Sequence, residues 1–279
     1  IDGLRRLEYR GYDSAGAAFH DGNAFSLARE TGRVENLAAT LRESNPTSTL
    51  GIAHTRWATH GAVTVSNTHP HLSHDGKIAL VHNGVIENYG PLKRILEGKG
   101  IEFSSETDSE VLSNLIAYHY ARLEGEEEQF AQALREALSQ CRGAYGIAVL
   151  CVDEPGFLLG ARRGSPLVVG LGDGETFLAS DASAFVGRVR DAVYLKDGEI
   201  ALLREDGFRI ITMQGEDAQA VSQPIDQTVE DVEMGDFDSF MEKEIFEQPV
   251  ALENALRGRF GDDGTTAKLG GLEGHEDEL

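Results

Sequence analysis

The chain has 279 residues, which is enough for one large domain or for one domain with a flanking segment. Its 47 acidic residues outnumber the 25 basic ones, and the resulting net charge of -22 repels nucleic acid and anionic membranes. The sequence contains no apolar run near the roughly 18 residues that a membrane span requires. Its two cysteines, Cys141 and Cys151, form no disulfide framework and suit a reducing cytoplasm. We therefore expect a cytoplasmic protein with neither nucleic acid nor membrane as a partner.

The first part of the chain combines short strands with helices. Residues 1–9 carry a helical pattern, and residues 14–20 and 24–29 predict a hairpin around an Asp-Gly-Asn turn. Residues 34–43 have the spacing of an amphipathic helix, and the apolar run of residues 50–53 predicts a buried strand. These elements lead into a segment with an unusual set of polar side chains.

A dense group of polar and aromatic side chains directly follows the strand at 50–53. It comprises His54, Thr55, Arg56, Trp57, Thr59 and His60. A guanidinium binds a carboxylate through two parallel hydrogen bonds, and short polar donors with an apolar lid beside it suit a small polar ligand. The alternative is a strand end whose polar groups cap the neighbouring loops.

Residues 61–74 predict an exposed, proline-bearing loop that is rich in histidine. With the preceding His60, its histidines are His69, His71 and His74. Their spacing is compatible with metal ligands, but neither a cysteine nor a cluster of carboxylates joins them. We therefore expect no metal site and no cofactor.

Two further polar positions each admit two interpretations. Residues 77–82 predict a buried strand followed by Asn83 and Gly84. This pair is either a turn or an oxyanion site, in which a side-chain amide and a glycine N–H point at one oxygen. Asp108 lies just before a helix predicted over 111–122. It is either a helix cap, as Thr107 also would be, or a carboxylate that holds an ammonium group.

The remaining elements predict an α+β fold. Helices are expected at 88–100 and 129–140, and strands at 145–152, 156–161, 166–170, 176–179, 192–195, 199–203 and 208–212. Helices inserted in blocks between antiparallel strands favour stacked sheets with helices outside. Beyond these strands we expect an acidic linker at 214–238, a helix at 239–257 and a loosely ordered tail at 261–279.

Five motifs occur in one order along the chain. They are Leu4-Arg-Arg-Leu-Glu-Tyr-Arg-Gly-Tyr-Asp-Ser-Ala-Gly16, His54-Thr-Arg-Trp-Ala-Thr-His-Gly61, Asn67-Thr-His-Pro-His71, His82-Asn-Gly-Val-Ile-Glu-Asn88 and Glu106-Thr-Asp-Ser-Glu-Val111. Together they resemble the glutaminase half of the glutamine–fructose-6-phosphate aminotransferases, which are class II glutamine amidotransferases. The segment Met241-Glu-Lys-Glu-Ile-Phe-Glu-Gln-Pro249 also resembles the lead into that family's sugar-isomerase half.

The resemblance implies a particular fold, substrate and domain order. The fold is that of the N-terminal-nucleophile hydrolases, with four αββα layers, and the substrate is L-glutamine. An amidotransferase domain would occupy residues 1–213. Residues 214–279 would form an acidic linker and a helix that lead to a sugar-isomerase domain.

The resemblance also implies roles for individual residues. Those that would bind glutamine or support its pocket are Arg56, Thr59, His60, His69 and Asp108. In this assignment Arg56 holds the α-carboxylate, helped by Thr59 and His60, and Asp108 holds the α-ammonium group. Asn83 and Gly84 would form the oxyanion hole, and Trp57 would gate an ammonia channel.

Two parts of the family's pattern fall outside these residues. The family's nucleophile is a cysteine at the mature N-terminus, whose own α-amino group acts as the base, whereas this chain begins at Ile1. The sugar-isomerase half, which would bind fructose 6-phosphate and form a homodimer, is the other part. We therefore expect truncation at both ends, a fold without its first strand and no glutamine hydrolysis by these residues alone. The alternative is a non-catalytic glutamine-binding or scaffold module.

Overall fold

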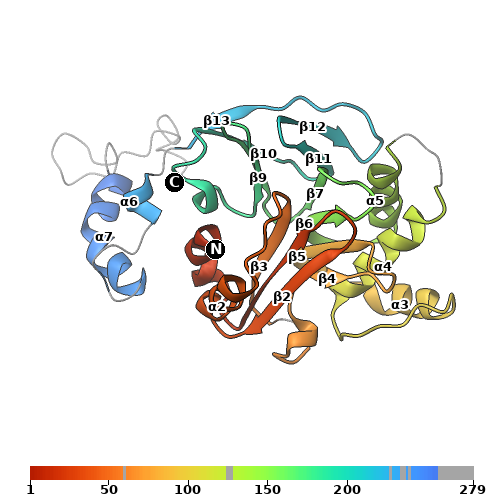
Figure 1. Ribbon diagram of the computed structural model, residues 1–279. Helices are drawn as coiled ribbons and strands as arrows, with labels where there is room; N and C mark the ends of the chain where they lie inside the picture. The colour runs from red at the N-terminus through yellow and green to blue at the C-terminus, as the bar shows by residue number, and fades with distance from the viewer. Residues whose placement is uncertain (59–60, 124–127, 226–227, 233–236, 238–239, 257–279) are drawn as a thin grey trace, which may run out of the picture. The chain divides into compact units, whose positions relative to one another are not determined.

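The computed structural model describes residues 1–58, 61–123, 128–225, 228–232, 237 and 240–256 (Figure 1). The chain divides into two compact units, Ile1–Val232 and Glu233–Leu279. The boundary expected at residue 213 falls within the first unit, because strand β13 (Ser222–Pro224) pairs with β10 (Asp191–Tyr194). The second unit contains helix α7 (Phe240–Leu256), close to the helix predicted at 239–257.

The centre of the first unit is a six-stranded sheet with the order β12-β11-β7-β6-β5-β4. Its strands are β4 (His71–Leu72), β5 (Ile78–Ile86), β6 (Gly143–Cys151), β7 (Leu158–Arg163), β11 (Glu199–Arg204) and β12 (Gly207–Thr212). Neighbouring strands run antiparallel. Side chains alternate between the two faces, so each face needs its own covering layer.

Three helices cover one face of this sheet (Figure 1). They are α3 (Tyr89–Glu97), α4 (Asp108–Tyr120) and α5 (Gln129–Gln140). Ile78, Leu80 and Ile86 of β5 are buried in the core that these helices form with the sheet. Their even spacing is that of a strand with one apolar face, and their burial holds the helices on the sheet.

Two smaller sheets cover the opposite face, with the orders β2-β1-β3 and β13-β10-β8-β9. Their other strands are β1 (Ser14–His20), β2 (Phe25–Thr31), β3 (Gly51–Arg56), β8 (Val168–Leu171) and β9 (Thr176–Ala179). The odd-numbered Ala79 and Val81 of β5 lie in the core between the sheets, together with Ile52 of β3 and Val169 of β8.

A second helical layer completes the first unit. Leu37 of α2 (Val34–Ser44) clusters with Ala15 and Ala17 of β1, and Leu4 of α1 (Asp2–Leu7) joins them. Short helices η1 (Glu8–Arg10), η2 (Val65–Asn67), η3 (Ala182–Phe185) and α6 (Val229–Val232) lie in the connections. The layers confirm the expected αββα arrangement. Among the described helices, none has the length and apolar character needed to cross a bilayer.

Two strands are longer than the sequence predicts. The strand expected at 50–53 continues to Arg56, and the strand expected at 77–82 continues to Ile86. Pairing with β1 and β6 keeps these polar extensions in the sheet, although their side chains break the apolar pattern.

The prediction of an exposed loop at 61–74 is wrong in part. This segment contains η2 and β4, and His69 and His71 are buried. Their burial comes from contacts with distant segments, which the local sequence does not display.

Candidate active site

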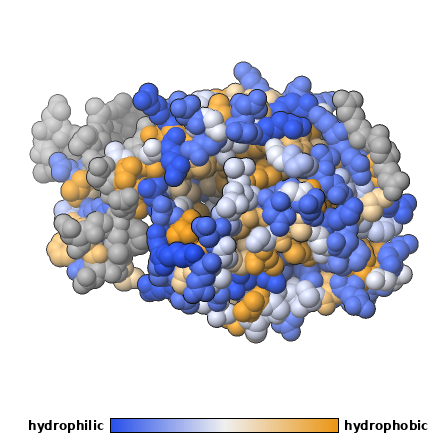
Figure 2. Space-filling view, in the orientation of Figure 1, coloured by the Kyte–Doolittle hydropathy of each residue, from blue (hydrophilic) through white to orange (hydrophobic). Residues whose placement is uncertain are grey.

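A cavity of ≈ 1030 Å³ lies between the sheets of the first unit. Residues of β3 and β5, the first residues of α4, and parts of α1, β9 and η3 line it. In the view of Figure 2 the first unit is hollowed near the middle of its face, with hydrophobic side chains next to hydrophilic ones around the hollow. A concave site between layers is a common place for a small ligand to bind.

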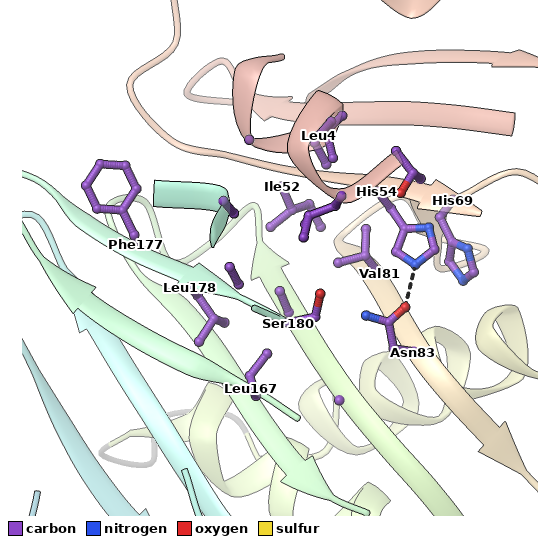
Figure 3. A pocket seen from close by; sticks show the side chains of 18 of the residues that line it. Leu4, Ile52, His54, His69, Val81, Asn83, Leu167, Phe177, Leu178 and Ser180 are labelled. Carbon is purple, nitrogen blue, oxygen red and sulfur yellow. Dashed lines mark hydrogen bonds between the residues drawn. The ribbon is translucent and has the colours of Figure 1, made fainter. Parts of the chain in front are cut away.

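The facing strands give the cavity an apolar part and a polar part. Because side chains alternate along a strand, Ile52, His54 and Arg56 of β3 share one face, as do Val81 and Asn83 of β5. Figure 3 shows the apolar Ile52 and Val81 beside His54 and Asn83, which are joined by a hydrogen bond. A bound ligand therefore meets apolar side chains at one end and hydrogen-bonding groups at the other.

Arg56 is a buried cation at the end of β3. Its Nη1 donates to the carbonyl oxygen of Ala62 at 3.4 Å. Burial lowers the pKa of the guanidinium, while Asp13 and Asp108 raise it. Since an arginine side chain loses its proton only far above neutral pH, the group stays charged at pH 7. The cavity thus contains a fixed positive charge.

The loop after Arg56 begins with Trp57, which is 60% exposed and whose ring centroid lies 5.7 Å from that of Tyr12. The backbone N–H of Ala58 donates to a carboxylate oxygen of Asp13. Asp13, the residue before β1, therefore holds the start of this loop. Its place in the sequence did not indicate this role. Thr59 and His60 lie outside the described residues.

Asn83 and Gly84 lie inside β5, opposite Gly146 and Tyr145 of β6. The turn interpretation is therefore wrong. Gly84 has a φ of +134°, and a Cβ at this position would stand 2.1 Å from the carbonyl oxygen of Ala144, so glycine is required. Both residues line the cavity. The extended backbone of these two residues is compatible with the remaining interpretation, the oxyanion site.

Asp108 is the first residue of α4, but its side chain does not cap the helix. Thr107 is the N-cap, and its side chain accepts from the backbone N–H of Glu110. The buried Asp108 instead accepts from the N–H of Ile86 through Oδ2, at 2.7 Å. Asp108 and Arg56 thus bring opposite charges to one cavity.

Four histidines are buried at or beside the cavity, namely His54, His69, His71 and His82. The ring centroids of His54 and His69 are 4.3 Å apart, and those of His69 and His71 are 4.8 Å apart. Burial lowers the pKa of His54 to about 4 and that of His71 to about 3, and it also lowers the pKa of His69. These three imidazoles are therefore neutral at pH 7.

Hydroxyl groups at the start of α4 hold this histidine cluster. Ser109 Oγ lies 2.9 Å from His69 Nε2 and 3.0 Å from His82 Nδ1. Thr107 Oγ1 lies 3.1 Å from His71 Nε2. Ser109 could not be predicted from its local sequence, because its partners are far away along the chain. The Glu-Thr-Asp-Ser motif was the signal that contained it.

Neither cysteine is placed to attack a ligand in the cavity. Cys141 and Cys151 are buried free thiols, and the described residues that line the cavity include neither. Burial raises the pKa of Cys141 to about 12 and that of Cys151 to about 11, which suppresses the reactive thiolate. In the described part of the chain, no three His, Cys, Asp or Glu side chains are grouped to hold a metal ion.

Known proteins share this fold and are similar in sequence to this chain. Residues 54–187 match the family described as glutamine amidotransferase domain. The Bacillus subtilis glutamine phosphoribosylpyrophosphate amidotransferase, solved with ADP and GMP, superposes with a TM-score of 0.63 at 26% identity, over 76% of this chain and 45% of that one. The chain therefore belongs to the glutamine amidotransferases with the N-terminal-nucleophile fold.

Within that class, the curated relatives point to a narrower group of enzymes. Glutamine–fructose-6-phosphate aminotransferase [isomerizing] of Thermus thermophilus is 46% identical over 270 residues, which cover 97% of this chain and 44% of that protein. The protein of the same name from Chlorobaculum tepidum is 45% identical over 287 residues, covering 100% and 45%. The chain thus corresponds to the amidotransferase part of these enzymes and spans less than half of their length.

Proposed function

We propose that the cavity binds L-glutamine and that the chain is the glutaminase part of an enzyme that aminates fructose 6-phosphate. The observation that carries this proposal is the placement of Arg56, Asp108 and Asn83 around one cavity. A free amino acid has one carboxylate, one ammonium group and, in glutamine, one carboxamide. These three groups need an anion-binding cation, a carboxylate and an amide donor, respectively.

The roles of the individual residues follow from their chemistry. The buried Arg56 would hold the α-carboxylate, assisted by Thr59 and His60. Asp108 would accept from the α-ammonium group. Since both partners are largely removed from water, their interactions with a zwitterion are stronger than at a surface.

Other positions would act on the reacting carboxamide. The Asn83 side chain and the Gly84 N–H would donate to the oxygen on which negative charge develops. His69 would support the pocket through its packing on His54. The exposed Trp57 would gate the passage of ammonia out of the site.

The named relatives extend well beyond the matched region, which supports proposals about the whole protein. We propose that ammonia released from glutamine passes to a sugar-isomerase domain, where fructose 6-phosphate becomes glucosamine 6-phosphate. That domain would also form a homodimer. The free state of both buried cysteines supports a cytoplasmic location.

A second candidate is a glutamine-binding module without catalysis. It is favoured by the position of both thiols outside the cavity lining. The discriminating observation is the reading frame upstream of Ile1. Codons for Met-Cys-Gly roughly 16 residues earlier, the spacing that the family resemblance implies, would supply the nucleophile that an N-terminal-nucleophile enzyme requires.

The test is performed on the protein expressed from its complete gene. Glutamate release and glucosamine 6-phosphate formation are measured together, with fructose 6-phosphate present or omitted. Both products are expected. Glutamate release without the amino sugar would reject the proposed acceptor. Glutamine binding without either product would favour the binding module.

A further inference from the structure

His54 binds no group of the ligand in the function proposed above, yet it makes a partly buried hydrogen bond to the residue that would stabilise the oxyanion. Its Nε2 lies 3.0 Å from Asn83 Oδ1, from one strand to the strand facing it (Figure 3). Both side chains line the cavity. The direction of this bond decides which end of the Asn83 amide is available to a ligand.

The other ring nitrogen of His54 fixes that direction. His54 Nδ1 is buried and has no hydrogen-bond partner among the described residues. A buried N–H without a partner is rarer in proteins than a buried acceptor without one. The proton of the neutral ring therefore belongs on Nε2, where Asn83 accepts it, and Nδ1 is the bare acceptor.

The alternative tautomer would be unfavourable for two reasons. It would leave a buried N–H on Nδ1 without a partner. It would also require Asn83 to donate from Nδ2 to His54, which would turn Oδ1 toward the cavity. An oxygen facing the ligand repels a developing oxyanion, whereas an NH₂ group stabilises it.

We propose that His54 is a positioning residue that holds the Asn83 carboxamide by its oxygen, so that its NH₂ group faces the ligand. This inference rests on the proposed oxyanion role of Asn83. In Figure 3 the Asn83 nitrogen points away from His54, toward the side of the pocket where Ser180 lies. The amide is thus oriented before any substrate arrives.

The surroundings of His54 keep its ring in one orientation. The His69 ring packs on it with a centroid distance of 4.3 Å, and His69 Nε2 is anchored by Ser109 Oγ at 2.9 Å. His69 Nδ1 is also buried without a partner among the described residues, so His69 donates from Nε2 by the same reasoning. The ring that orients Asn83 is itself held by an oriented ring.

The first experiment observes the hydrogen bond directly and does not depend on activity. Long-range ¹H–¹⁵N NMR on the 279-residue chain near pH 7 distinguishes the two neutral tautomers of each histidine. The His54 signal, assigned by its loss in His54→Gln, is expected to show a protonated Nε2 and a bare Nδ1. A protonated Nδ1 with a bare Nε2 would overturn the inference.

The second experiment measures catalysis in the protein expressed from its complete gene. His54→Leu removes the donor, and we expect kcat for glutamate release to fall about tenfold to a hundredfold with little change in KM. His54→Gln keeps an N–H donor and is expected to retain most of the turnover. The matched control is His71→Leu, since His71 is a buried member of the same cluster outside the cavity lining.

A double-mutant cycle separates positioning from a general structural effect. In an Asn83→Ala background, which itself should lose about a hundredfold in kcat, His54→Leu is expected to add almost nothing. An equal loss in both backgrounds would show that His54 does not act through Asn83.

If Asn83→Ala retains full turnover, the proposed oxyanion role fails, while the NMR result still decides the hydrogen bond. If His54→Leu does not fold, the kcat of His54→Gln decides the role. A large fall in that kcat would contradict the positioning role of His54.

Discussion

Asp108 accepts a hydrogen bond from the backbone N–H of Ile86, with 2.7 Å between Oδ2 and N. This bond joins the first residue of α4 to the strand that carries Asn83 and Gly84. One carboxylate therefore fixes the distance between the proposed ammonium site and the proposed oxyanion site. In the proposed function, the same carboxylate also accepts from the ammonium group of the ligand.

The Asp108→Asn substitution tests the ammonium site. The new side chain retains an oxygen that can accept from Ile86, but it loses the negative charge. We expect glutamine affinity to fall by on the order of 2–4 kcal/mol while the melting temperature changes little. Calorimetric titration of L-glutamine measures the first quantity. Glu110→Gln, another buried carboxylate change on α4, is the control, and equal loss in both variants would contradict the assignment.

The Arg56→Lys substitution tests the carboxylate site. Lysine keeps the positive charge but loses the planar fork that binds a carboxylate through two hydrogen bonds. We expect a loss of on the order of 2–4 kcal/mol in glutamine affinity, measured by the same titration. Arg29→Lys is a matched control, since burial also lowers the pKa of Arg29 but the residue does not line the cavity. An unchanged affinity in Arg56→Lys would exclude Arg56 from the site.

The buried histidines predict a pH dependence of stability. The pKa of His54 is about 4 in the folded chain, whereas an unfolded histidine has a pKa of about 6.5. Between these values the unfolded state binds more protons, so the free energy of unfolding falls as the pH is lowered through this window. The loss between pH 6.5 and pH 5 is on the order of 2 kcal/mol for His54 alone.

Denaturant titrations across this pH range measure the effect. His54→Gln removes one of the shifted groups and should give a shallower dependence than the unmodified chain. A free energy of unfolding that stays constant from pH 7 to pH 5 would show that these imidazoles are not buried and neutral.

The two thiols lead to a prediction about activity. We expect the 279-residue chain to release no glutamate from glutamine, because its described thiols are buried, have raised pKa values and lie outside the cavity lining. An added N-terminal segment of the family type, beginning with a processed cysteine, should restore release. Cys141→Ser and Cys151→Ser should then leave turnover unchanged. If the unextended chain turned over glutamine, and either substitution abolished that turnover, the nucleophile would be Cys141 or Cys151 instead.

The same added segment is expected to raise the melting temperature. Within the described residues, β3 and β9 each lie at the edge of their sheet, and both contribute to the cavity wall. An edge strand has backbone groups without a strand partner, and a further strand beside it would pair them. A segment of scrambled sequence is the control, and an equal shift with both segments would contradict strand addition.

Local patterns in the sequence were sufficient for elements with regular apolar spacing. The hairpin of residues 14–20 and 24–29 and the helix at 129–140 correspond closely to β1, β2 and α5. The Asp-Gly-Asn turn marks the hairpin, and the helical spacing of the apolar residues in α5 reflects the burial of one face of that helix. Such burial can be recognised without knowing which neighbour provides it.

Elements whose order comes from distant partners could not be predicted in this way. Asn83 stays extended because it pairs with Gly146 of β6, although Asn-Gly is locally a turn signal. His69 is buried and is hydrogen-bonded to Ser109, which lies 40 positions away in the sequence. The motifs contain Arg56, Asn83 and Asp108 of the cavity lining. Neither the hydrogen bond from His54 to Asn83 nor that from Ile86 to Asp108 follows from these motifs.

The most direct test of the glutamine site is a crystal structure of this chain with L-glutamine. We expect the ligand in the cavity with its α-carboxylate on Arg56, its α-ammonium group on Asp108 and its carboxamide oxygen toward the NH₂ group of Asn83. Glutamine bound outside the cavity, or bound with its carboxylate and carboxamide ends exchanged, would contradict the proposed site.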